Sequence, residues 1–181
     1  MISKTFSSKC QIILIETIFI GFLATLFLNI AAYLFSMAVN LPQSNFGLLG
    51  RWIDMMAHGR FITSSISNEP AIPHELAIGL LGHLFTGFMF TLIYLLACTY
   101  HPIRKISPIL SGLLFGLILM VFPMFVEYPA MGVRVFSEQW PYITASSLRI
   151  ITCHIFFGLG LGFGRILLEY IRNARVSTAV V

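Results

Sequence analysis

The chain has 181 residues, of which 57% are hydrophobic and only 10% are Asp, Glu, Lys or Arg. An ordinary soluble domain has about 25% charged residues, so this chain lacks the polar side chains needed to cover a soluble globule. The composition therefore excludes a soluble fold and predicts an all-α membrane protein, one integral membrane domain over residues 1–181 with the lipid bilayer as its partner.

Four stretches with few charged residues are long enough to cross a bilayer. A helix rises 1.5 Å per residue, so about 20 residues cross about 30 Å of hydrocarbon. The fourth stretch contains Arg149 and Arg165, and Glu169 can pair with Arg165 from the next helical turn. We expect four transmembrane helices in a bundle, near residues 12–39, 76–98, 106–126 and 147–171.

The eleven Lys and Arg residues are divided unequally between the two sides of the predicted membrane. Cytoplasmic loops carry an excess of Lys and Arg, so the richer side is predicted to be cytoplasmic. This places both termini in the cytoplasm. Because the charges are spread over helix ends, we expect no nucleic-acid partner. Seven fall on the cytoplasmic side (Lys4, Lys9, Arg104, Lys105, Arg165, Arg172 and Arg175) and four on the outer side (Arg51, Arg60, Arg134 and Arg149).

The first outer loop contains an amphipathic segment over residues 46–61. Its apolar residues recur at helical spacing, which predicts a short helix lying at the outer membrane surface. Trp52 and Phe61 would be interfacial anchors, and Arg51 and Arg60 would contact lipid headgroups. The alternative is a lid that caps a substrate site.

Pro123 lies near the end of the third predicted span. Proline lacks a backbone N–H and disrupts helix interiors. We therefore expect the third helix to end or kink there, leaving Glu127 and Tyr128 at the outer surface.

Each predicted span carries a stripe of small or polar residues four positions apart. In the first span these are Thr17, Gly21, Thr25 and Asn29. Residues four apart share a helix face, and small residues allow membrane helices to approach closely. We expect the stripes to face one axis and to pack through Gly79, Gly87, Gly112, Gly116, Gly158 and Gly162.

The second and fourth spans share a local pattern. His83-Leu-Phe-Thr-Gly87 corresponds to His154-Ile-Phe-Phe-Gly158, and each follows a long outer loop. This suggests a duplicated helical hairpin, with halves at residues 12–98 and 106–171, an arrangement that some transporters use.

The two histidines lie at matching depths in the predicted membrane. His83 and His154 are each seven residues from the outer end of their span, about 10 Å deep, while Asn29 is about 15 Å deep. Glu127 lies at the outer mouth of the third span. This polar centre could supply three ligands to a transition metal or pass protons between imidazoles. The alternative is that each histidine bonds a carbonyl or Thr across a helix interface and only packs.

Several short motifs are spread over most of the chain: Gly50-Arg51-Trp52, Gly59-Arg60-Phe61, residues 75–87 with His83, residues 123–132, and His154-Ile-Phe-Phe-Gly-Leu-Gly-Leu161. In these motifs the sequence resembles, over about residues 21–164, the uncharacterised bacterial inner-membrane family catalogued as domain of unknown function 2938. The resemblance implies a small multi-pass protein of the bacterial inner (plasma) membrane and no particular activity.

Three functional classes remain open. An outward-facing polar centre favours binding or transport of a small ion or solute, because ionisable groups inside a membrane usually mark a site. A structural or interaction protein with packed histidines is the alternative, and an intramembrane enzyme or redox protein is the third class. The glycines of residues 158–164 do not fit a nucleotide-binding loop, and His74-Glu75 lacks the second histidine of a zinc helix. We expect no enzyme activity and no cofactor, and the sequence specifies neither the cargo nor an oligomeric state.

Overall fold

The computed structural model describes residues 2–100, 103, 105–133 and 142–178. Every regular element in these residues is helical, which confirms the all-α prediction. In chain order the elements are α1 (Ile2–Ala38), α2 (Phe46–Ala57), the 3-10 helix η1 (Ile66–Asn68), α3 (Glu75–Ala97), α5 (Pro108–Leu119), the π-helical turn η2 (Pro123–Glu127), α6 (Tyr128–Ala130) and α7 (Tyr142–Thr178).

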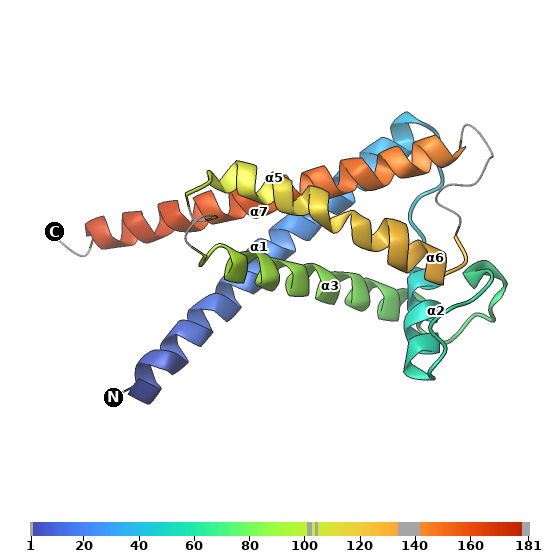
Figure 1. Ribbon diagram of the computed structural model, residues 1–181, viewed down its shortest axis with the longest axis horizontal. Coiled ribbons are helices and arrows are strands. Elements are labelled where there is room, and N and C mark those ends of the chain that lie inside the picture. The colour runs from blue at the N-terminus through green and yellow to red at the C-terminus, as the bar shows by residue number, and fades with distance from the viewer. Residues whose placement is uncertain (1, 101–102, 104, 134–141, 179–181) are drawn as a thin grey trace.

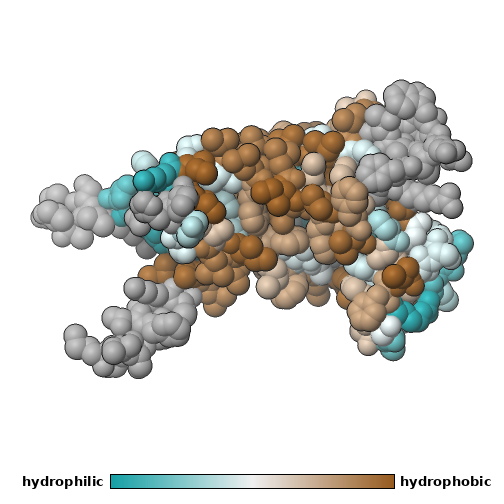
Figure 2. All heavy atoms as spheres, in the orientation of Figure 1, coloured by the Kyte–Doolittle hydropathy of each residue, from teal (hydrophilic) through white to brown (hydrophobic). Residues whose placement is uncertain are grey.

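Four of these helical segments are long and apolar enough to cross a membrane, which confirms the predicted number of spans. Their middle part is covered with hydrophobic residues, whereas hydrophilic residues lie at both ends (Figure 2). A hydrophobic zone bounded in this way is the surface that a bilayer requires. The spans are Gln11–Ala38, Glu75–Ala97, Pro108–Ala130 and Ala145–Asn173.

The four segments run alternately in opposite directions, so that both termini lie at one end and α2 and α6 lie at the other (Figure 1). We call the second end the α2 end. Helix α1 packs against α3 and α7, and α7 packs against α5. Helices α3 and α5 meet through aromatic rings: the ring centroids of Phe90 and Phe122 are 5.7 Å apart and those of Tyr94 and Phe115 are 5.3 Å apart.

Glycines set the close approach of α5 and α7. A Cβ atom added at Gly112 would overlap the carbonyl oxygen of Gly158, and one added at Gly116 would overlap that of His154. On α7, Cβ atoms at Gly158 and Gly162 would press on the backbone of α5 in return. Larger residues at these positions would force the two helices apart.

The glycines of α3 face two different neighbours. Gly79 approaches α2, since a Cβ there would overlap the carbonyl oxygen of Phe46, and Gly50 on α2 approaches the carbonyl of Glu75 in the same way. Gly87 approaches Thr25 of α1. Gly79 therefore packs against α2 and does not point to an axis shared by the four spans. The reason is that α2 folds back onto the first turns of α3.

The third span is interrupted near Pro123. The α-helix α5 ends at Leu119, and Pro123 begins a π-helical turn in which the N–H of Tyr128 bonds the carbonyl of Pro123, five residues earlier. A π turn holds one more residue than an α turn, so the chain stays helical through the proline. Glu127 and Tyr128 are partly buried at the end of this turn, and their placement at the outer surface of a membrane stays a prediction.

Candidate functional site

A cavity of about 660 Å³ lies between the four spans at the α2 end. It reaches from the exposed residues Gln43 and Ser44, in the connection between α1 and α2, to the buried side chains of Thr25 and Phe157. Its volume falls within the range of about 300 to 1,000 Å³ that small-molecule sites occupy. The cavity is therefore open to the surface and large enough for an organic solute.

The four residues of the predicted polar centre all line this cavity. They come from different elements: Asn29 from α1, His83 from α3, Glu127 from η2 and His154 from α7. The structure thus brings together side chains that are up to 125 positions apart in sequence, His154 and Asn29 being the extremes.

Each histidine uses one ring nitrogen in a hydrogen bond. Nε2 of His83 lies 3.1 Å from Oδ1 of Asn29, and Nδ1 of His154 lies 2.8 Å from the carbonyl oxygen of Ile150. Both oxygens can only accept, so these two nitrogens donate. In the neutral imidazoles, Nδ1 of His83 and Nε2 of His154 are then left as hydrogen-bond acceptors.

Two oxygen-bearing side chains on the cavity wall lack partners among the residues that the structure describes. The carboxylate of Glu127 makes no hydrogen bond and no ion pair there. The hydroxyl of Thr25, a residue that is 4% exposed, is also unpaired. A buried polar group costs free energy unless it is hydrogen-bonded, so both groups are better satisfied when something polar occupies the cavity.

Arg149 lines the same cavity, although the sequence singled it out only for membrane orientation. Its Nη1 donates to Oγ of Ser36 at 3.3 Å and to the carbonyl of Pro42 at 2.8 Å. The thiol of the buried Cys153 also lies on the wall. Arg149 and Cys153 are four positions apart on α7, and this spacing, which also revealed the other stripes, was the signal that could have found them.

The polar centre does not form the predicted set of three metal ligands. In the described part of the chain, no three His, Cys, Asp or Glu side chains are grouped so that they could hold a metal ion. His83 and His154 each bond a protein oxygen, and neither of these two bonds involves Glu127. The arrangement offers hydrogen-bonding groups around a space.

A second polar cluster fixes α2 to the start of α3. The Arg51 guanidinium bonds both oxygens of Glu75, at 2.5 and 3.0 Å, and also the carbonyl of Glu69, at 3.0 Å. Glu75 raises the pKa of Arg51 through this hydrogen bond. Next to it, Glu69 accepts from Thr63 at 2.7 Å and from Arg60 at 2.7 Å, and these two contacts hold the pKa of its carboxyl below the usual range.

Trp52 is 8% exposed, packs with Met55, Ile66 and Met131, and donates its indole N–H to the carbonyl of Phe61 at 2.9 Å. Arg51 and Trp52 therefore have partners within the protein. The Phe61 side chain is 61% exposed and Arg60 is also exposed. The roles of Trp52 and Phe61 as interfacial anchors and of Arg51 and Arg60 as headgroup contacts stay predictions.

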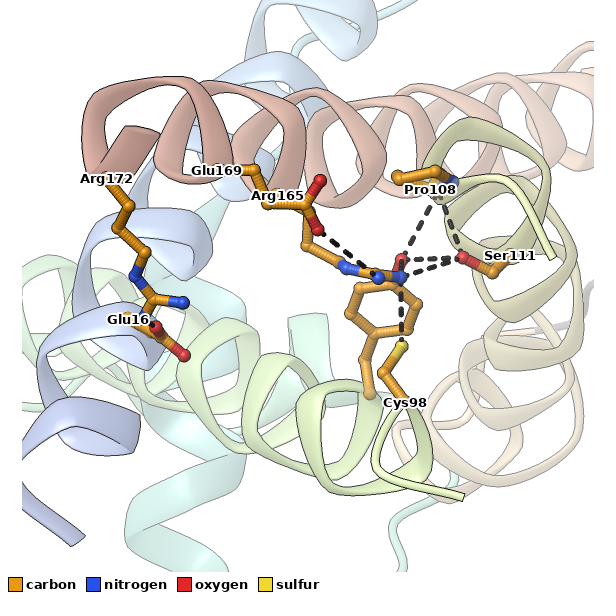
Figure 3. A network of polar contacts seen from close by, with 8 residues as sticks. Glu16, Cys98, Pro108, Ser111, Arg165, Glu169 and Arg172 are labelled. Atoms are coloured by element: carbon orange, nitrogen blue, oxygen red, sulfur yellow. Dashed lines mark hydrogen bonds and ion pairs between the residues drawn. The ribbon is translucent and has the colours of Figure 1, made fainter. Parts of the chain in front are cut away.

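A third cluster lies toward the end that carries the termini (Figure 3). Nη1 of Arg165 lies 3.3 Å from each of the Tyr94 hydroxyl, the Cys98 sulfur and the Ser111 hydroxyl, so one side chain joins α3, α5 and α7. The predicted pair of Arg165 with Glu169 is confirmed at 3.7 Å. Tyr94 and Ser111 could not be found from the sequence, because their contact depends on how three helices pack.

One ion pair joins the first and last helices of the chain. Glu16 of α1 pairs with Arg172 of α7, and both appear beside the Arg165 cluster in Figure 3. Neither residue was predicted to have this role.

Comparison with curated proteins found no match, and comparison with solved structures found none either. A family model described as "Protein of unknown function (DUF2938)" matches residues 18–167. This match covers most of the 181 residues and includes all four spans in whole or in large part. It confirms the resemblance drawn from the sequence motifs, and the chain belongs to the DUF2938 family of proteins of unknown function.

Proposed function

We propose that this protein is an inner-membrane protein of bacteria, with both termini in the cytoplasm, that binds a small solute in the cavity at the α2 end. The charge bias of the loops supports the orientation. The observation that carries the binding function is the convergence of Asn29, His83, Glu127 and His154 on one cavity of about 660 Å³.

Binding explains this arrangement better than a purely structural role does. A structural role predicts side chains that fill the space between helices and hydrogen bonds that join one helix to another. The bond of His83 to Asn29 joins α3 to α1, as a structural role predicts, but the bond of His154 runs to Ile150 of its own helix and joins no two helices. Glu127 has no partner among the described residues, so its carboxylate adds nothing to the packing of the spans.

The native thiol of Cys153 provides the test, because it lies on the cavity wall. N-ethylmaleimide is applied to the purified protein, and its addition to Cys153 is measured by mass spectrometry of the peptide. A protein-free extract of cellular metabolites and lipids should slow this addition about tenfold when the ligand is near ten times its Kd. The double variant His83→Ala, His154→Ala should lose most of the protection.

Cavity-filling variants supply the matched control. Ala32 lines the cavity, whereas Ala77 is exposed on α3 and does not. Ala32→Phe should slow alkylation of Cys153 without any extract, and Ala77→Phe should leave the rate unchanged. If the extract gives no protection at any concentration, the binding function is rejected in favour of the structural role.

A further inference from the structure

We propose that the solute is a zwitterion with an apolar body, whose ammonium group pairs with Glu127 and whose anionic group pairs with Arg149. This inference rests on the proposed binding function and adds the chemical class of the ligand.

The charges on the cavity wall are the first step. Among the described residues that line the cavity, only Glu127 has a carboxyl group and only Arg149 has a guanidinium group, and the ionised forms of the two have opposite signs. They form no ion pair with each other. A ligand with one charge would leave one of them uncompensated in an apolar space, where an unpaired charge is costly. A zwitterion compensates both.

The hydrogen-bonding groups agree with this division. An ammonium group donates three hydrogen bonds, and Glu127 offers it a carboxylate that has no partner among the described residues. Nδ1 of His83 and Nε2 of His154 are further acceptors on the same wall.

Arg149 offers the opposite character. Its Nη1 donates to Ser36 and Pro42, and its guanidinium also bonds the side chain of Tyr128, which lines the same cavity. A guanidinium has five N–H donors, so Arg149 can add a charge-assisted bond to a carboxylate or phosphate.

The rest of the wall is apolar and aromatic. Phe46, Phe90, Phe122 and Phe157 line the cavity between the polar groups, so the ligand needs an apolar body as well as two charges. Two sources have this chemistry: a free amino acid with an apolar side chain, and the headgroup and upper chains of a zwitterionic lipid.

Matched probes test the proposal on the full-length protein in detergent, with binding measured by calorimetry. For a free solute the probes are L-phenylalanine, its cationic analogue phenethylamine and its anionic analogue 3-phenylpropionate. For a lipid the probes are dihexanoyl phosphatidylethanolamine and the anionic dihexanoyl phosphatidylglycerol. We expect at least one zwitterion to bind about tenfold or more tightly than its single-charge analogues, as expected for one added charge-assisted bond.

Two variants locate the charges. Glu127→Gln should abolish the preference for the zwitterion over the anionic analogue, and Arg149→Gln should abolish the preference for phenylalanine over phenethylamine. Glu169→Gln removes a carboxylate of α7 outside the cavity and should change neither preference. If a variant fails to fold, the probe comparison on the wild type still decides.

The preferred zwitterion identifies the source: phenylalanine indicates a free solute, and phosphatidylethanolamine indicates a lipid. If single-charge probes bind as tightly as both zwitterions, if no zwitterion binds, or if a folded Glu127→Gln or Arg149→Gln variant keeps its full preference, the zwitterion proposal is overturned. Protection of Cys153 by the cellular extract would persist in that case if the binding function itself is correct.

Discussion

Glu69 holds the segment that follows α2 through two side-chain contacts, from Thr63 and from Arg60. Both contacts favour the ionised carboxylate, which is why its pKa lies below the usual range, with the Thr63 bond as the larger cause. A carboxyl whose pKa is lower in the folded protein stabilises the fold above its unfolded pKa, and this contribution is lost as the pH falls through the folded pKa.

Glu69→Gln should therefore be less stable than the wild type at pH 7, and this difference should shrink as the pH falls below about 4, the usual range for Glu. Gln resembles the protonated carboxyl, so the two proteins become similar once Glu69 is protonated. Thermal unfolding in detergent between pH 7 and pH 3 measures the difference. A difference that stays constant over this range would show that ionisation of Glu69 does not contribute.

Among single residues, the sequence could identify side chains through their spacing along a helix and their distance from the ends of a span. His83, His154 and Asn29 were placed by counting residues from the ends of their spans, and all three line one cavity. Arg149 was counted among the basic residues of the outer side, because hydropathy does not show in which direction the side chain of an arginine at a helix end points. Its contacts with Ser36 and Pro42 depend on the packing of α1 against α7.

At the level of elements, the contact between α5 and α7 depends on backbone meeting backbone. Gly158→Ala should destabilise the protein by about 1 to 3 kcal/mol, because the new Cβ would overlap the carbonyl oxygen of Gly112, which cannot move aside without shifting a helix. Unfolding in mixed detergent micelles with increasing sodium dodecyl sulfate measures the change.

Gly164→Ala is the matched control on the same helix. Its Cβ would lie 3.1 Å from Cγ2 of Ile20, the end of a side chain that can adjust, so a smaller effect is expected. Equal effects at both positions would mean that the cost comes from the helix itself and not from the α5–α7 contact.

The spans were predictable because a bilayer requires every backbone polar group inside it to bond internally, which forces long apolar segments to be helices. The passage through Pro123 was not predictable from this rule. A proline removes one donor, and the chain could end the helix or widen one turn. The wider turn is what the structure shows, and the choice depends on the packing of η2 against α7.

For the molecule as a whole, the two termini lie at the end opposite to α2 (Figure 1), and η1 follows α2 in the chain. A reporter that works only in the cytoplasm should be active when fused after Val181 and inactive when inserted near Ser67, because the richer share of Lys and Arg lies on the side of the termini. Reporter activity in intact cells measures this. The reverse pattern would overturn the orientation, and activity of both fusions would contradict four spans.

The pairing of Glu16 with Arg172 also bears on how the protein is made. A ribosome releases the N-terminal helix first and α7 last. Until α7 arrives, α1 carries an acidic side chain in an apolar helix with no basic partner, and ionisable residues inside a membrane are costly when unpaired. The carboxylate of the first helix therefore gains this basic partner only after the last helix has been synthesised. An interrupted chain would keep Glu16 without the arginine that pairs with it in the finished protein.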